Sequence, residues 1–187
     1  MLKLIKKTIG RGVEYTASRA LSLCFMVVFF VCPTSLYAAD KVYEKPSAFL
    51  KRHFKKIPKT KVYTLTAVDQ KKLRSILGHA YKQKKVRYWS DGRKLGVILN
   101  EIGKTEPITV GFLIKGGKIA ELKVLIYRES HGSEVSRPFF TKQFVGAKLN
   151  GEKLTKKIDG IVGSTLSVRA LEKLSVTSLY LSTKLGK

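Results

Sequence analysis

The sequence predicts an α+β fold, in which an antiparallel meander of strands packs with helices in a single domain after an N-terminal signal segment. Between residues 86 and 127, short runs of alternating apolar and polar residues are separated by glycine turns, which is typical of antiparallel strands. Apolar residues at helical spacing lie before and after this run. Strands and helices do not alternate along the chain, so the order disfavours a Rossmann sheet.

Residues 1–39 have the three parts of a secretory signal peptide. Five basic residues and one acid occupy the first 20 positions, residues 21–32 form an apolar run, and small residues follow Pro33 up to Ala39. The alternative is an uncleaved anchor, but a membrane-spanning helix needs about 20 apolar residues and this run is shorter. We therefore expect residues 1–39 to be removed on export.

The remainder, residues 40–187, is strongly basic and lacks cysteine. Both cysteines, Cys24 and Cys32, lie in the leader, so the exported protein cannot form an internal disulfide. The whole chain carries a net charge of +24, of which the leader's five bases and one acid account for +4, which leaves +20. This charge suits an acidic partner or an anionic membrane face, although an evenly solvated surface explains it equally well. Export and the even spread of lysines argue against nucleic acid.

Residues 40–60 are predicted to form an N-terminal linker and a short helix ahead of the domain proper. Residues 40–45 show no apolar period and are expected to be the linker. The helix should begin at Pro46 and end before Pro58, because proline is favoured in the first turn of a helix and cannot continue one.

The domain itself is predicted to span residues 61–187. A capping box formed by Thr66 and Asp69 should open its first long helix, which is expected to reach about Gln83 although Gly78 weakens it. The other elements are expected, in order, as strands at 61–65, 86–89, 95–99, 107–114 and 119–127, a short helix at 137–145, a turn at 150–151, and a last helix from about Thr165.

Residues 119–127 show the clearest alternation of any strand. They follow Gly116 and Gly117, which are expected to make a hairpin turn. Because successive side chains of a strand point to opposite faces, two sets are expected to separate. Ala120, Leu122, Val124 and Ile126 should share one face, and Glu121, Lys123, Leu125 and Tyr127 the other.

Residues 159–167, Asp-Gly-Ile-Val-Gly-Ser-Thr-Leu-Ser, combine an acid, two glycines and three hydroxyl residues just ahead of the last helix. A helix N-terminus carries unpaired N–H groups and a partial positive charge, so this composition suits a phosphate group. Gly163 lets a bulky group approach the backbone, and the hydroxyls of Ser164, Thr165 and Ser167 can donate hydrogen bonds. Ordinary helix capping explains the same residues, and this stretch alone favours capping.

This stretch resembles the flavinylation motif of the FMN-binding domain. That domain is found in the C and G subunits of sodium-pumping and Rnf-type electron-transfer complexes and in small periplasmic FMN-binding proteins. The family pattern is Asp, two residues, Ser or Thr, Gly-Ala-Thr, one residue, and Ser or Thr. Asp159, Gly163, Thr165 and Ser167 match the pattern, whereas Ser164 replaces Ala and Val162 replaces Ser or Thr. The change at Val162 removes a hydroxyl from the recognition loop but leaves the acceptor threonine.

The resemblance implies that FMN is joined through a phosphoester to the hydroxyl of Thr165, and that a flavin transferase installs it after export. It implies that Asp159 is recognised by the transferase or orients a metal, and that Gly163 supplies backbone room. It also places Ser164, Leu166 and Ser167 beside the attached cofactor.

The similarity extends upstream, from about Tyr63 to Tyr180. Glu129, His131 and Phe144 resemble the family's strand-end glutamate, glycine loop and aromatic helix, and the resemblance implies that they contact the cofactor. Read from the residues alone, Glu129 and His131 also suit a solvated loop, and aromatic residues on a helix are more often core than a cofactor wall.

Taken with the leader, the resemblance implies a periplasmic electron carrier rather than an enzyme, with a peripheral place at the inner membrane also compatible. FMN supplies the chemistry. The partners implied are the flavin transferase and acidic redox proteins, either membrane-bound or periplasmic. The main alternative is a non-redox basic module that binds an anionic partner or a membrane surface. A small flavin reductase ranks last, because no nicotinamide-binding motif is present. The three histidines lack metal-ligand spacing, so no metal is expected.

Overall fold

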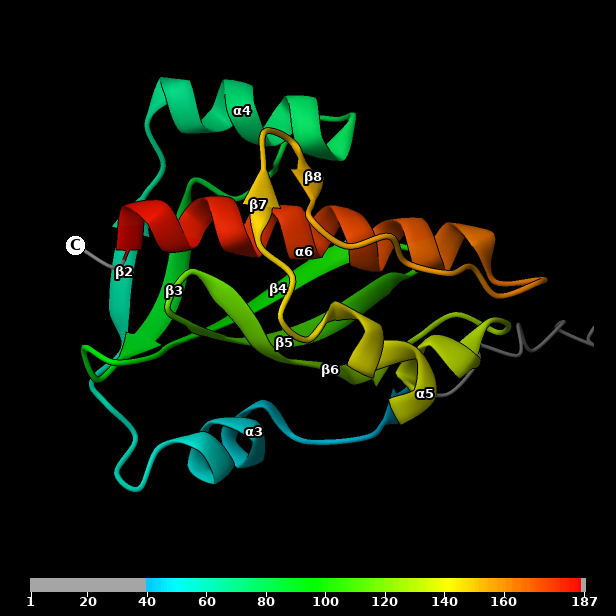
Figure 1. The fold of residues 1–187 in the computed structure, drawn as a ribbon, viewed down its shortest axis with the longest axis horizontal. Helices are drawn as coiled ribbons and strands as arrows, with labels where there is room; N and C mark the ends of the chain where they lie inside the picture. The colour runs from blue at the N-terminus through cyan, green and yellow to red at the C-terminus, as the bar shows by residue number, and fades with distance from the viewer. Residues whose placement is uncertain (1–39, 186–187) are drawn as a thin grey trace, which may run out of the picture. The chain divides into compact units, whose positions relative to one another are not determined.

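The computed structural model describes residues 40–185, and Figure 1 shows their arrangement. The predicted signal peptide, residues 1–39, lies outside the described residues. No helix among residues 40–185 is long and apolar enough to cross a membrane. The elements are β1 (Lys41–Val42), α3 (Pro46–His53), β2 (Lys61–Thr64), α4 (Ala67–Leu77), β3 (Lys85–Ser90), β4 (Leu95–Ile102), β5 (Pro107–Lys115), β6 (Lys118–Tyr127), η2 (Ser133–Ser136), α5 (Pro138–Thr141), η3 (Lys142–Phe144), β7 (Leu149–Asn150), β8 (Lys153–Leu154) and α6 (Thr165–Leu185).

A six-stranded antiparallel sheet with helices on both faces confirms the predicted α+β class. Its order is β1-β6-β5-β4-β3-β2, so β2 to β6 are the predicted meander. Helix α6 lies along one face with α4 beyond it, and α3 covers the other face (Figure 1). The larger core fills the space between the sheet and α6, and a smaller one lies under α3.

Helix α4 begins as predicted and ends earlier. Thr66 is its N-cap, and the side chain and backbone of Asp69 complete the capping box. The helix ends at Leu77 rather than near Gln83, because Gly78 adopts the left-handed conformation (φ 81°) and its N–H returns to the carbonyl of Arg74. This is a common helix C-terminus, and the helical spacing of apolar residues did not reveal it.

The segment predicted as a linker, residues 40–45, contains a strand of the sheet. Lys41 pairs with Tyr127 and Val42 with Ile126, so β1 extends the sheet beyond β6. The physical reason is that β6 is the outer strand of the meander, and its free N–H and C=O groups accept one more partner. The predicted short helix is present as α3, which starts at Pro46.

Two glycines let α3 approach the sheet closely. Phe49, at the centre of the smaller core, is fully buried, and its ring lies over Gly111 of β5. A Cβ atom at Gly111 would lie 2.9 Å from the ring, and one at Gly96 would lie 3.2 Å from the ring of Phe54. The close packing of α3 on the sheet therefore depends on the absence of a side chain at Gly96 and Gly111.

Substitution of Gly111 by alanine is expected to lower the free energy of unfolding by about 1–3 kcal/mol, the usual cost of an overpacked core. The ring of Phe49 cannot swing away because it is enclosed on all sides. Urea unfolding measures the change. Gly160→Ala is the matched control, since nothing lies within 4 Å of a Cβ atom there. Equal stability of the two variants would contradict the close approach.

A β-bulge changes the predicted faces of β6. The register of β5 against β6 shifts between Thr109 and Val110, which pair with Ile126 and Val124, so Leu125 is the extra residue. Between Glu121 and Leu125 the strand follows the predicted alternation, but beyond the bulge Tyr127 returns to the main core and Ile126 packs against the smaller one. The prediction that Tyr127 and Val124 lie on different faces of the strand was therefore wrong, because a bulge adds one residue and shifts the alternation.

A second register shift, between Leu113 and Ile114, which pair with Glu121 and Ile119, makes Ala120 an extra residue as well. Ile119, rather than the exposed Ala120, therefore shares the core face with Leu122 and Val124, and the prediction for Ala120 was also wrong.

The helix predicted at 137–145 is a broken one. Helix α5 has Pro138 in its first turn, and the chain tightens into η3 before Gly146 ends it in the left-handed conformation (φ 83°). Phe140 and Phe144 are both fully buried, which fixes this segment against β6. The predicted turn at 150–151 joins β7 and β8 in a small hairpin.

Candidate functional site

The predicted attachment motif lies where the loop after β8 turns into α6. The helix begins at Thr165, as expected. Gly163 has φ 80°, and the N–H of Ser164 bonds the carbonyl of Ile161 at 3.0 Å, so a tight turn precedes the helix. The carbonyl of Ser164 accepts from the N–H of Val168, which makes Ser164 the cap residue. The N–H groups of the first turn have no partner within the helix, and that turn contains no acid.

The side chain of Thr165 faces solvent, whereas those of its hydroxyl neighbours Ser164 and Ser167 are each only 5 % exposed. Leu166 is 45 % exposed, and Val162 is fully exposed. No heavy atom lies within 4 Å of a Cβ atom built on Gly163. The hydroxyl of Thr165 is thus the accessible one of the three, and the space beside Gly163 is open to a bulky substituent.

A buried polar cluster anchors the first turn of α6 to the end of β6. The hydroxyl of Tyr127 donates to the carbonyl of His131 and lies 2.9 Å from Oγ of Ser167. Oγ of Ser164 donates to the carboxylate of Glu134 at 3.3 Å. Burial raises the pKa of Tyr127 more than the bond with Ser167 lowers it, so the phenol stays protonated and able to donate. The structure therefore brings the upstream segment and the motif together.

Gly132 marks the closest approach of the upstream loop to the helix. It has φ 84°, and a Cβ atom there would lie 2.9 Å from the hydroxyl of Tyr127 and 3.2 Å from Oγ of both Ser164 and Ser167. Figure 1 shows the start of α6 at the same end of the domain as α5 and the loop before it. Tyr127 was not among the predicted site residues, and the bulge that turns it toward α6 has no signal in the alternation pattern.

Glu129 is buried and faces the β4–β5 turn. Its Oε1 atom accepts from the backbone N–H groups of Lys104, Thr105 (2.8 Å) and Glu106 (2.9 Å), and Oε2 accepts from the Thr105 hydroxyl at 3.1 Å. Burial raises the pKa of this carboxyl, but the N–H groups outweigh it and hold the pKa below its usual value. The structure thus gives Glu129 a turn-anchoring role, with both of its oxygens in use.

The remaining predicted residues are divided between surface and core. His131 has an exposed side chain, and only its carbonyl joins the cluster. Asp159 is exposed, and its N–H donates to Oε1 of Gln143 at 2.8 Å, which ties the motif loop to η3. Phe144 is fully buried and packs edge to face on Phe140, with ring centroids 5.5 Å apart, so it belongs to the core.

The groups around Thr165 are suited to a phosphate ester. Unpaired N–H groups, an exposed hydroxyl and an open glycine suit the phosphate end of a nucleotide. Cavities of about 520 Å³ and 340 Å³ lie in the described part of the chain, and Thr165 lines neither of these two. A flavin attached there would lie outside both cavities, beside the exposed side chains of Val162 and Leu166. Residues 40–185 contain no group of three or more His, Asp or Glu side chains suited to a metal ion.

Comparison with known proteins gives no further support for any family. No family model matches the chain, and no curated protein matches it.

Replacement of Tyr127 by phenylalanine is expected to lower the free energy of unfolding by about 1–2 kcal/mol, because the carbonyl of His131 and the hydroxyl of Ser167 lose a buried partner. Chemical denaturation measures this cost. Tyr43→Phe is the control, since Tyr43 is 42 % exposed. An unchanged Tyr127→Phe protein would mean that the cluster does not hold the loop to α6.

Proposed function

We propose that this protein is an exported electron carrier that holds FMN as a phosphoester on Thr165. The observation that supports the proposal most strongly is the exposed threonine hydroxyl at the first residue of α6, inside the motif at 159–167 and next to the open Gly163. In this proposal the chain carries out no reaction of its own on a small substrate. Bound FMN takes up and releases one or two electrons.

The attachment step is a phosphoryl transfer that needs an activated flavin donor. A flavin dinucleotide and a transferase provide it: the Thr165 oxygen forms a bond to the phosphorus of the FMN half, the pyrophosphate bond breaks, AMP leaves and the hydroxyl proton is released. The first-turn N–H groups of α6 would be available to the resulting phosphodiester, while Ser164 and Ser167 stay buried and hold the turn.

Donor and acceptor are proposed as redox proteins at the inner membrane and in the periplasm. The charge of +20 on residues 40–187 favours acidic surfaces on both, because opposite charge speeds encounter. The salt dependence of electron transfer with such a partner would report on this charge.

The test is the mass and colour of the protein recovered from the periplasm of its own cell. We expect a yellow protein whose colour survives denaturation, and a peptide containing Thr165 that is heavier by one FMN less one water. Colourless protein of unmodified mass, from cells that contain a flavin transferase, would refute the proposal.

A non-redox basic module is the second candidate, favoured by the number of lysines that form no ion pair within residues 40–185. It requires a colourless native protein with strongly salt-dependent binding to an anionic partner. The same mass measurement separates the two candidates.

A further inference from the structure

Seven cations gather at the end of the domain where α6 finishes. We call this set the basic end face. All seven side chains are exposed, and none takes part in an ion pair with another residue of the described range 40–185. They come from the α3–β2 loop, the start of β2, the β3–β4 turn and both sides of the β5–β6 turn: Lys55, Lys56, Lys59, Lys61, Arg93, Lys115 and Lys118.

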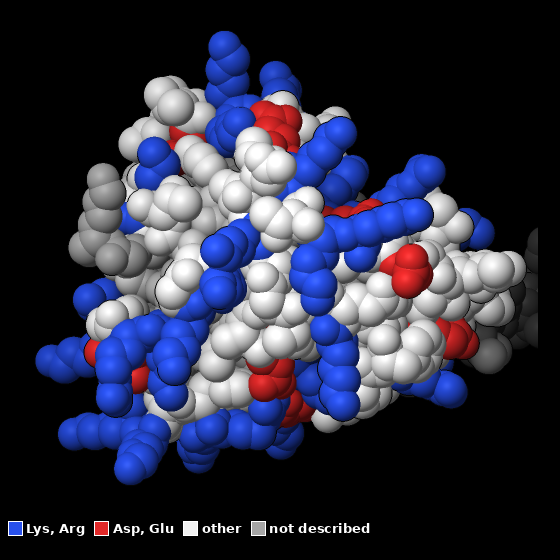
Figure 2. Space-filling view, viewed as in Figure 1, with Lys and Arg blue, Asp and Glu red and all other residues white. Residues whose placement is uncertain are grey.

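These residues lie together because several bonds close this end of the domain. Lys94 donates to the carbonyl of His53, and Nε1 of Trp89 donates to Oγ1 of Thr60 at 3.0 Å, which ties the lysine-rich loop to the sheet. Lys61, Arg93 and the β5–β6 turn line one cavity of about 520 Å³. Figure 2 shows Lys and Arg gathered at lower left, over α3 and the loop that follows it.

The basic end face carries an electrostatic cost in the isolated protein. Lys115 and Lys118 are directly opposite each other in the register of β5 and β6, an arrangement that is unfavourable for like charges. Asp91 belongs to the same end, but its Oδ1 already accepts the N–H groups of Arg93 and Lys94, both at 3.0 Å. An external anionic surface would offset this repulsion.

We propose that the basic end face docks the protein onto a bilayer that contains anionic phospholipids. Protein–protein interfaces are depleted in lysine and enriched in aromatic residues and arginine, whereas clustered lysines are the usual feature that binds anionic lipid. Six of the seven cations here are lysines. The composition of the face therefore favours a membrane over an acidic protein.

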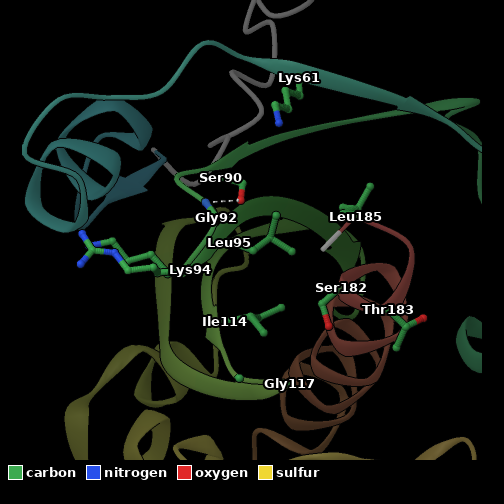
Figure 3. A pocket seen from close by; sticks show the side chains of 12 residues that line it. Lys61, Ser90, Gly92, Lys94, Leu95, Ile114, Gly117, Ser182, Thr183 and Leu185 are labelled. Carbon is green, nitrogen blue, oxygen red and sulfur yellow. Dashed lines mark hydrogen bonds between the residues drawn. The ribbon is translucent and has the colours of Figure 1, made fainter. Parts of the chain in front are cut away.

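The cavity at this end has a mixed lining beneath the charges. Leu95, Ile114 and Leu185 line it, and Figure 3 shows the amine of Lys61 directed toward it from β2, while Lys94 points away. Ser90, Ser182 and Thr183 also line the cavity, so its floor is mixed, and the attraction to lipid headgroups comes from the lysines of the basic end face.

Docking at this face sets the orientation of the domain. Helix α6 runs for about 30 Å, at 1.5 Å per residue, from Thr165 to the basic end face. A protein bound through that face turns the start of α6 away from the bilayer. This consequence for a flavin on Thr165 depends on the proposed function, but the docking itself does not.

The test is cosedimentation of the exported protein with vesicles made of equal parts phosphatidylglycerol and phosphatidylcholine, or of phosphatidylcholine alone. We expect binding to the anionic vesicles only, with loss on raising NaCl from about 0.1 M to about 1 M, as the Debye length falls from ~10 to ~3 Å. The variant K55E/K56E/K59E should bind at least about tenfold more weakly.

The matched control is K104E/K142E/K157E, which changes the net charge equally through exposed lysines outside the basic end face. This control should lose much less binding than K55E/K56E/K59E. Since the wild type and the variants share the same N-terminus, differences in binding between them report on the basic end face. K115Q/K118Q, which removes the opposed lysines without adding charge, is the second variant and should also bind more weakly. Equal losses in both glutamate triples, equal binding to both vesicles, or binding only to acidic proteins would overturn the proposal. None of these readouts needs flavin.

Discussion

Thr165→Ala protein is expected to carry no covalent flavin when it matures beside wild-type protein in cells that contain the transferase. The acceptor oxygen is gone, and the other two hydroxyls of the motif cannot replace it, because Ser164 and Ser167 are buried and held by Glu134 and Tyr127. The loss should be essentially complete. Flavin absorbance after denaturation and the mass of the peptide that contains position 165 measure it.

Three further variants separate attachment from folding. Thr165→Ser retains a hydroxyl and should accept flavin, and Thr183→Ala, an exposed threonine at the other end of α6, should be modified like wild type. Val162→Thr restores the hydroxyl of the family pattern at a fully exposed position and should not slow modification. Since Thr165 is a surface residue, Thr165→Ala should unfold within about 0.5 kcal/mol of wild type. Denaturation-resistant colour in a stable Thr165→Ala protein would refute the assignment.

The order of elements could be predicted because it depends on local chemistry. Glycine turns, the Thr66–Asp69 capping box and the start of the last helix at Thr165 each act over a few residues, and the structure has all of them. Strand β1 could not be predicted, because two residues become a strand only when the edge of β6 is beside them. The bulge at Leu125 likewise depends on how β5 and β6 pair.

The predicted site residues also divide into those placed by local sequence and those placed by contacts between distant parts of the chain. Residues 163–167 are contiguous, so a motif places them together whatever the fold. Tyr127 reaches Ser167 across 40 positions, and Glu129 reaches the turn at Thr105 across 24, so neither contact has a sequence signal. The exposure of Thr165 and the burial of Phe144 likewise depend on which face of each helix meets the sheet.

Substitution of Asp69 by alanine is expected to cause the largest loss of stability, about 3–4 kcal/mol, since hydrogen bonds to a charged group are worth about 1.5–3 kcal/mol each and a helix cap about 1. The carboxylate is 1 % exposed. Oδ1 accepts from the hydroxyl of Tyr180 at 2.7 Å, and Oδ2 from the hydroxyl of Tyr63 at 2.9 Å and from Thr66. Alanine removes the Asp69 half of the capping box of α4 and leaves the buried hydroxyl of Tyr180 without a partner. Urea unfolding at neutral pH measures the loss.

The same carboxylate should make the free energy of unfolding decrease as the pH is lowered into the acid range. Burial raises its pKa, but the hydrogen bonds from Tyr180, Thr66 and Tyr63 outweigh burial and hold the pKa at about 2, below the ordinary 3.8. A depressed pKa stabilises the folded state above the unfolded value and loses that contribution as pH falls toward 2. The contribution at neutral pH is about 2 kcal/mol.

Asp69→Asn should therefore remove most of the difference in stability between pH 5 and pH 2 that is due to this group, since an amide does not titrate. Asp159→Asn is the control, because the carboxylate of Asp159 is exposed and makes no hydrogen bond within residues 40–185. Tyr180→Phe tests the cause: its cost should shrink when Asp69 is already asparagine, because the two side chains share one bond. If the two substitutions have additive costs in the double variant, the hydrogen bond between Asp69 and Tyr180 does not couple α4 to α6. If Asp69→Asn leaves the acid transition unchanged, another group causes the loss of stability at low pH.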